Sequence, residues 1–291
     1  MVDWKAVEQF LGSLSCCRVC PLECGVNRLQ GEKGKCRVGF LPEIASYHPH
    51  FGEESILSGW RGSGTIFFSG CNMKCVYCQN YSISQLGEGK AIPIEDLVRI
   101  MLALERMGCH NINLVSPTHF SPQILKALYL AREKGLSIPI VYNTGGYDKL
   151  ETLRLFRGVV DIYLPDMRYA NEESGLRYSG IPNYPEVNRR ALLEMFEQVG
   201  EVVLKEGVAA KGLIIRILLI PSLIEEALEN LRFIAENISR RVHITLMRQY
   251  RPVYKVSAER FSELNGFIDD TTYREVVRFA QGLGLKNLIL Q

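Results

Sequence analysis

The sequence lacks an excess of charge of either sign. Its 291 residues include 34 Lys and Arg against 32 Asp and Glu, for a formal net charge of +2. Proteins that bind nucleic acids or anionic membranes through electrostatics carry clustered basic residues. The near balance therefore gives no reason to expect a nucleic acid or a membrane surface as a partner.

Long apolar runs are also missing. The longest, residues 213–224, is interrupted by an arginine and a proline and is too short to span a bilayer. Residues 1–15 contain Asp3, Lys5 and Glu8 among apolar residues. This pattern is typical of an amphipathic helix and not of a signal peptide, which needs an uninterrupted apolar stretch. We therefore expect a soluble protein in the cytoplasm.

Cysteine, in contrast, is plentiful and unevenly distributed. Eight of the nine cysteines fall within the first 78 residues. They are Cys16, Cys17, Cys20, Cys24, Cys36, Cys71, Cys75, Cys78 and Cys109. In a chain of this length without a signal sequence, such crowding indicates metal binding rather than disulfides.

Cys71, Cys75 and Cys78 follow a short apolar run that reads as a strand, residues 64–69. This group lacks a fourth ligand, since the loop contains no histidine and no further cysteine. A closed structural zinc site needs four ligands, and iron–sulfur clusters are normally held by four thiolates. Three thiolates suit a four-iron cluster with one iron left open to another ligand.

A second group lies in residues 16–36, which are rich in glycine and show neither helical nor strand periodicity. Cys17, Cys20, Cys24 and Cys36 make a set of four metal ligands, and Cys16 could replace Cys17. Zinc and a second iron–sulfur cluster both fit this set, and a reduced loop without metal is the alternative.

From residue 64 onward, apolar β-branched runs alternate with helical patterns. Such runs are typical of strands buried on both faces of a parallel sheet. The predicted strands are 64–69, 111–116, 138–142, 159–164, 213–220, 242–247 and 286–290. The predicted helices are 94–107, 121–134 with Ser121 as N-cap, 147–157, 186–205, 224–238 and one opened by a capping box at Thr272-x-x-Glu275.

Alternation of strands and helices with short connections predicts right-handed βαβ units, and hence an α/β fold with a full or partial β/α barrel. Periodicity alone does not separate a partial barrel from a closed barrel or an open sheet. Residues 37–63 read as irregular. We divide the chain into residues 1–55, an N-terminal helix and a Cys-rich metal-binding segment, and residues 56–291, the barrel with a C-terminal helix and strand.

The spacing Cys71-x3-Cys75-x2-Cys78, with Tyr77 before the last cysteine, resembles the motif of the radical S-adenosylmethionine (SAM) superfamily. The resemblance implies a partial parallel barrel of about six β/α units, open on one side. It also implies a four-iron four-sulfur (4Fe-4S) cluster on the three cysteines and SAM at the open iron. Residues 64–252 as a whole resemble uncharacterised homologues of pyruvate formate-lyase activating enzyme.

Active sites of parallel barrels lie at the C-terminal ends of the strands, so the residues there are candidates for holding SAM. The resemblance implies that backbone near Tyr77 meets the adenine. Ser116, Thr118 and His119 stand where the superfamily usually has a Gly-Gly-Glu segment that holds the amino group. Asn143 is a candidate for the ribose or the carboxylate.

Two further candidates lie on later strands. Asp166-Met167-Arg168 resembles an Asp-x-Lys element of activating enzymes, with arginine in place of lysine. Arg216 lies within a buried strand and needs an anionic partner. The methionine carboxylate of SAM is the partner we favour, and Asp166 or another internal carboxylate is the alternative.

The resemblance implies reductive cleavage of SAM to methionine and a 5′-deoxyadenosyl radical, which takes hydrogen from a substrate. The electron would come from a donor such as a flavodoxin or ferredoxin. The substrate could be a glycine of a partner protein, as for an activase. One alternative is a small molecule or peptide, with an auxiliary N-terminal cluster; another is a catalytically silent metal-binding protein. The Cys-rich segment and residues 170–185 are candidate lids over the site.

Overall fold

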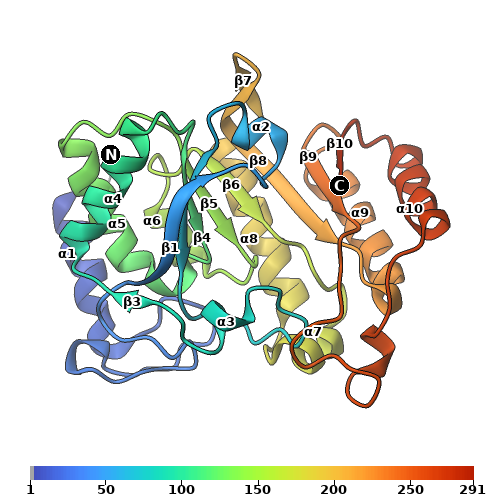
Figure 1. Cartoon of the computed structure of the whole chain (residues 1–291), viewed down its shortest axis with the longest axis horizontal. Helices are drawn as coiled ribbons and strands as arrows, with labels where there is room; N and C mark the ends of the chain where they lie inside the picture. The colour runs from blue at the N-terminus through green and yellow to red at the C-terminus, as the bar shows by residue number, and fades with distance from the viewer. Residues whose placement is uncertain (1–2) are drawn as a thin grey trace.

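The computed structural model describes residues 3–291, in which strands and helices alternate along most of the chain (Figure 1). The strands are β1 (Glu43–His50), β2 (Ser63–Phe68), β3 (Lys90–Ala91), β4 (Ile112–Val115), β5 (Ile140–Thr144), β6 (Ile162–Pro165), β7 (Val203–Lys205), β8 (Val208–Leu218), β9 (His243–Met247) and β10 (Asn287–Leu290). The α helices are α1 (Trp4–Gly12), α2 (Ser55–Ser58), α3 (Tyr81–Ser84), α4 (Ile94–Arg106), α5 (Ser121–Glu133), α6 (Leu150–Leu155), α7 (Glu172–Ser179), α8 (Tyr184–Val199), α9 (Ile224–Asn237) and α10 (Asp270–Gly282). Short 3-10 helices cover Ser13–Cys16, Arg28–Gln30, Thr118–Phe120, Pro221–Leu223 and Ser262–Leu264.

Within the described residues, the strands form one open path in the order β10-β9-β8-β6-β5-β4-β2-β1-β3, and β7 pairs with β8 beside it. β2, β4, β5, β6, β8, β9 and β10 pair in parallel. β1, β3 and β7 pair antiparallel with their neighbours. The prediction of a partial parallel β/α barrel is confirmed: six parallel strands are followed by the C-terminal helix α10 and the strand β10.

The central strands are buried on both faces because helices and loops cover them. Every residue of β5 and of β6 is buried, as expected for parallel strands made of continuous apolar runs. Helix α4 turns Leu97, Val98 and Met101 into the core, each at most 1% exposed. Full burial of an aliphatic side chain of this size stabilises the fold by about 1.5–3 kcal/mol.

Several predicted boundaries are wrong. Residues 37–63 are not irregular throughout, because they contain β1 and α2. β1 lies near the edge of the sheet, has a single buried residue and includes Pro49. It therefore lacks the buried apolar run by which a strand is recognised in the sequence. The helix predicted over 186–205 ends at Val199, where Gly200 adopts a φ of 69°, and the chain then returns as β7.

Two helix caps also differ from the prediction. Ser121 is the first residue of α5 rather than its N-cap, and its hydroxyl donates to the carbonyl of Thr118. The N-cap of α10 is Asp269, whose carboxylate accepts from the backbone N–H groups of Thr271 and Thr272. An N-cap at Thr272 would accept from the amides of residues 274 and 275. The helix begins earlier, at Asp270, so the amides of Thr271 and Thr272 are the ones that need a partner, and Asp269 supplies it.

The N-terminal helix packs on the outside of the barrel. Val7 and Leu11 of α1 belong to the same apolar core as α4 and α5, and the ring of Trp4 lies 4.9 Å from that of Tyr129. The amphipathic helix predicted near the N-terminus is therefore confirmed for residues 4–12. The division of the chain at residue 55 stays a prediction.

Candidate active site

The cysteine loop leaves the C-terminal end of β2 through Gly70. This residue has a φ of 76°, which favours glycine. A Cβ atom at this position would lie 2.5 Å from Cγ1 of Val38 and 2.7 Å from the carbonyl oxygen of Cys36. The turn into the cysteine loop thus requires glycine both for its backbone angle and for its contact with the Cys-rich segment.

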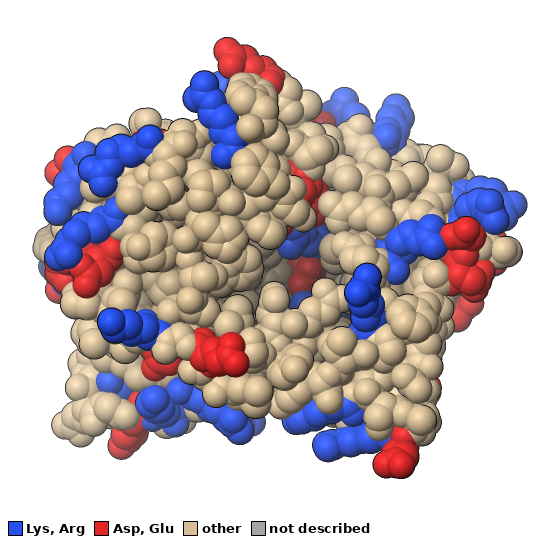
Figure 2. Space-filling view, in the orientation of Figure 1, with Lys and Arg blue, Asp and Glu red and all other residues tan. Residues whose placement is uncertain are grey.

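Cys71, Cys75 and Cys78 line one cavity of about 380 Å³ at the strand ends. Residues from five other strands or their following loops reach the same cavity. They are Ser116, Asn143, Thr144, Asp166, Arg168, Arg216 and Met247. Figure 2 shows acidic and basic side chains inside a hollow near the middle of an otherwise largely uncharged face.

The three cysteines of this cavity suit a cluster. Within residues 3–291, no set of three or more His, Cys, Asp or Glu side chains is placed to hold one metal ion. Three ligands of a four-iron cluster each bind a different iron, so they surround a volume instead of converging on one point. Cys71, Cys75 and Cys78 border such a volume.

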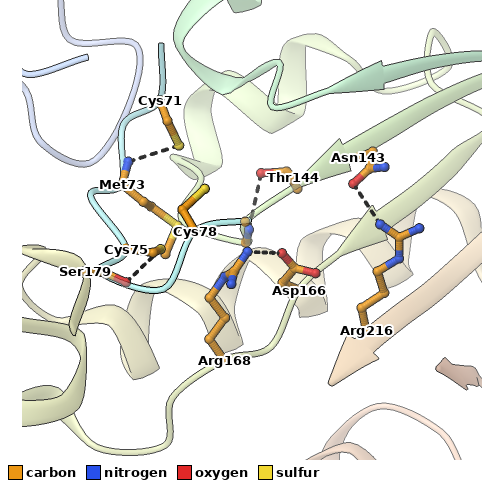
Figure 3. A network of polar contacts seen from close by, with 12 residues as sticks. Cys71, Met73, Cys75, Cys78, Asn143, Thr144, Asp166, Arg168, Ser179 and Arg216 are labelled. Atoms are coloured by element: carbon orange, nitrogen blue, oxygen red, sulfur yellow. Dashed lines mark hydrogen bonds and ion pairs between the residues drawn. The ribbon is translucent and has the colours of Figure 1, made fainter. Parts of the chain in front are cut away.

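The thiols of this loop are held by short polar contacts (Figure 3). The Oγ atom of Ser179 donates to Sγ of Cys75 at 2.9 Å, and the backbone N–H of Met73 donates to Sγ of Cys71 at 3.3 Å. Burial raises the pKa of the Cys71 thiol to about 12, and the adjacent Cys75 adds to the rise. Metal binding must therefore deprotonate these thiols, which couples it to proton release.

Asp166 and Arg168 form an ion pair beside the cysteines (Figure 3). The Nε atom of Arg168 is buried and has no hydrogen-bond partner within the described residues. A buried guanidinium N–H without an acceptor is unfavourable, and Arg168 is among the residues that line the cavity.

Arg216 is paired within the protein. Its Nε donates to Glu54 at 2.8 Å, its Nη2 contacts Glu53 and Glu54, and its Nη1 donates to the amide oxygen of Asn143 at 3.3 Å. Burial of Glu54 by itself raises the pKa of this carboxyl, but the Arg216 charge and its hydrogen bonds hold that pKa below its usual value. The partners of Arg216 are therefore the internal carboxylates of Glu53 and Glu54. This agrees with the alternative expectation, an internal carboxylate, and not with the favoured one, the SAM carboxylate. The carboxylate is that of Glu53 and Glu54 rather than that of Asp166.

The Ser-Pro-Thr-His segment after β4 divides into two parts. Ser116 lines the cavity with a φ of 58°, an uncommon value for a residue other than glycine. Thr118 and His119 are not among the described residues that line it. The Thr118 hydroxyl donates to Asp148 at 2.7 Å, and Nε2 of His119 donates to the carbonyl of Ser69 at 2.7 Å.

His119 thus contacts the backbone just before the cysteine loop instead of the cavity. Burial lowers the pKa of His119 to about 3, so the imidazole is neutral at physiological pH. The structure gives Thr118 and His119 partners within the protein.

Tyr77 is buried, and its hydroxyl lies 2.6 Å from that of Tyr169. It lines an adjoining cavity of about 210 Å³ together with Asp166, Arg168 and Arg216. The structure therefore brings Tyr77, Ser116, Asn143, Asp166, Arg168 and Arg216 around two connected hollows beside the cysteines.

Two groups of residues at this site were missed by sequence reasoning. Glu53 and Glu54 lie between β1 and α2, and their only sequence signal is that two acidic residues stand next to each other. Ser179 at the end of α7 has no signal at all, because 104 residues separate it from Cys75. The segment predicted as a lid contains α7, and the carbonyls of Tyr178 and Ser179 accept from backbone N–H groups of the cysteine loop.

The N-terminal cysteines differ in exposure. Cys17, Cys20 and Cys36 are buried and Cys24 is partly buried, whereas Cys16 is exposed. All nine cysteines are free thiols in the structure.

Residues 65–235, more than half of the chain, match the Radical SAM superfamily. The chain therefore belongs to this superfamily, and membership implies a 4Fe-4S cluster and SAM as cofactors. It is 34% identical over 275 residues to the uncharacterized protein MJ0674 of Methanocaldococcus jannaschii, a match that covers 89% of this chain and 72% of that protein. It is 23% identical over 205 residues to the pyruvate formate-lyase-activating enzyme of Clostridium pasteurianum, a match that covers 69% of this chain and 79% of that enzyme.

Solved structures support the same fold. SuiB of Streptococcus suis bound to S-adenosylmethionine superposes with a TM-score of 0.54 at 16% identity, covering 76% of this chain and 48% of SuiB. Methylornithine synthase (PylB) superposes with a TM-score of 0.51 at 14% identity, covering 76% of this chain and 68% of PylB. The chain thus spans about half the length of SuiB.

In the described part of the chain, no helix is both long and apolar enough to cross a bilayer.

Proposed function

We propose that this protein is a radical SAM enzyme that holds a 4Fe-4S cluster on Cys71, Cys75 and Cys78 and binds SAM in the adjoining cavity. When bound, these cofactors supply one-electron cleavage of SAM to methionine and a 5′-deoxyadenosyl radical, which removes hydrogen from a substrate. The observation that carries the proposal is that the three cysteines and the polar strand ends line one cavity.

The chain's own residues have distinct parts in this proposal. Arg168 has a free buried Nε–H and suits an anionic group such as the SAM carboxylate. Ser116 and Asn143 present hydroxyl and amide groups toward the same cavity and suit the amino and ribose groups. Backbone near Tyr77 would meet the adenine. Arg216 and its two glutamates hold the floor of the cavity in place.

We further propose an activase-like substrate, a backbone glycine on a partner protein. The similarity to pyruvate formate-lyase-activating enzyme supports this choice. A small molecule or peptide is the competing substrate. A low-potential donor such as a flavodoxin or ferredoxin would deliver the electron. A cluster site with free thiols suits the reducing cytoplasm.

The test is reconstitution with iron and sulfide without oxygen, followed by dithionite and SAM. We expect 5′-deoxyadenosine, measured by liquid chromatography and mass spectrometry. The Cys71→Ala/Cys75→Ala/Cys78→Ala variant should form none, whereas Cys109→Ala, a buried cysteine far along the chain, should match the parent. A fully loaded cluster that yields no 5′-deoxyadenosine would refute enzymatic function and leave the catalytically silent alternative.

The substrate is tested separately with short peptides that contain a central glycine deuterated at its α carbon. An activase-like enzyme should transfer deuterium to 5′-deoxyadenosine. Cleavage of SAM without any deuterium transfer from a panel of such peptides would favour a small-molecule substrate.

A further inference from the structure

The Cys-rich N-terminal segment contains a buried cation without a carboxylate partner. The side chain of Arg28 is 0% exposed. Its Nε and Nη2 donate to the carbonyl of Gly39 at 2.9 and 2.6 Å, and its Nη1 donates to the carbonyl of His119 at 2.6 Å. Among residues 3–291 no Asp or Glu forms an ion pair with it.

An arginine is always charged in a protein, and a buried charge without a counter-ion is strongly unfavourable. Neutral carbonyls satisfy the hydrogen bonds of Arg28 but not its charge. The remaining contact of Nη1 is Sγ of Cys17, at 3.9 Å. A negative charge on sulfur is therefore what this environment needs.

The other cysteines of the segment lie around the same place. Backbone hydrogen bonds join Cys17 to Val26 and Gly25, so residues 17 and 24–26 run side by side, and Sγ of Cys24 lies 3.9 Å from the carbonyl of Cys17. A Cβ on Gly34 would lie 2.5 Å from Sγ of Cys24. The backbone N–H of Glu23 donates to the carbonyl of Cys20, so a tight turn leads from Cys20 to Cys24, and the N–H of Arg37 donates to the carbonyl of Gly34 just before Cys36. Cys20 and Cys36 are both buried.

We propose that Cys17, Cys20, Cys24 and Cys36 form a tetrathiolate metal site whose negative charge is balanced by the buried Arg28. Four thiolates around Zn²⁺ carry a net charge of −2, and a cluster bound by four thiolates is also anionic. Either occupant supplies the charge that the guanidinium lacks. The proposal does not depend on the reaction proposed above.

The structure also selects among the neighbouring cysteines. Cys17 is buried next to Arg28, whereas Cys16 points to solvent. Among the described residues, the four cysteine side chains do not converge on one point. Metal binding would draw them together as it deprotonates them.

The full chain with Cys71→Ala/Cys75→Ala/Cys78→Ala provides the test, because it removes the other cluster. After reconstitution and gel filtration with a chelator, we expect either about one zinc per chain or about four irons with matching sulfide, measured by mass spectrometry and sulfide assay. The first result identifies a zinc site and the second identifies a cluster. A folded protein, by circular dichroism, that retains neither metal overturns the proposal.

Point variants in the otherwise unchanged chain give a second measurement that does not need the triple variant to fold. Cys17→Ser should remove one zinc or four irons from the total, and Cys16→Ser should remove none. Equal losses would refute the assignment of Cys17.

Arg28→Met should weaken metal retention 10- to 100-fold in a chelator competition, as for other residues that contact metal ligands. Arg18→Met, an exposed arginine in the same segment, is the matched control. Retention equal to that of the control would overturn the role of Arg28 as the counter-cation.

Discussion

Ser179 donates a hydrogen bond from its Oγ to Sγ of Cys75 at 2.9 Å, although 104 residues separate the two in sequence. The Ser179 hydroxyl in turn lies 2.7 Å from that of Tyr169, which lies 2.6 Å from the hydroxyl of Tyr77. The hydroxyl protons can therefore all point one way, from Tyr77 through Tyr169 and Ser179 to the sulfur. The end of α7 is fixed to the cysteine loop by this series.

Ser179→Ala should lower the reduction potential of the cluster proposed on Cys75. A hydrogen bond to a ligand sulfur favours the more negatively charged, reduced state. A net hydrogen bond of about 1 kcal/mol corresponds to roughly 40 mV for a one-electron couple. The measurement is a redox titration followed by electron paramagnetic resonance.

Ser174→Ala is the control for this effect, because Ser174 lies on the same helix and its hydroxyl donates to Glu226 instead. Its potential should equal that of the parent. Equal potentials for the Ser179 and Ser174 variants would show that the contact does not tune the cluster.

Gly70→Ala should destabilise the protein strongly. Its positive φ costs a residue with a side chain about 1–2 kcal/mol, and the clash with Val38 and the Cys36 carbonyl adds about 1–3 kcal/mol. Gly87→Ala isolates the first contribution, because Gly87 has a φ of 81° and open space around its Cβ position. Urea denaturation of both variants should give a clearly larger loss for Gly70, and equal losses would contradict the close approach seen here.

A feature of this structure could be predicted from the sequence when the residues that form it are close together in the chain. The cysteine spacing and the buried runs of β2, β4, β5 and β6 are local patterns, so the loop, the barrel and the strand-end location of the cavity could be predicted. The partners of Arg216 could not, because Glu53 and Glu54 precede it by more than 160 residues and carry no periodic signal. Thr118 and His119 follow a strand as expected, but the turn at Ser116 directs them toward Asp148 and Ser69.

Asp148→Asn should flatten the dependence of stability on pH. Burial raises the pKa of Asp148 despite hydrogen bonds from Thr144, Thr118 and Tyr142. The folded state then binds the proton more tightly than the unfolded state. As pH rises from the unfolded pKa of about 3.9 to the higher folded pKa, this group therefore lowers the free energy of unfolding. Urea denaturation at several pH values should show this loss in the parent and not in the variant.

Asp3→Asn, an exposed substitution of the same kind, is the control and should keep the pH profile of the parent. If the free energy of unfolding depends on pH in the same way for the parent and for Asp148→Asn, then ionisation of Asp148 in the folded protein costs no stability.

Arg216→Met should destabilise the protein by about 3–5 kcal/mol, because it leaves the carboxylates of Glu53 and Glu54 buried without their counter-charge. Arg99→Met breaks an exposed ion pair with Asp96 and should cost less than about 1 kcal/mol. Adding Glu54→Gln to Arg216→Met should recover part of the loss, since one of the two unpaired charges is then removed. The free energies of unfolding of the cofactor-free variants test this order, and a loss for Arg216→Met no larger than that for Arg99→Met would show that water reaches the two glutamates.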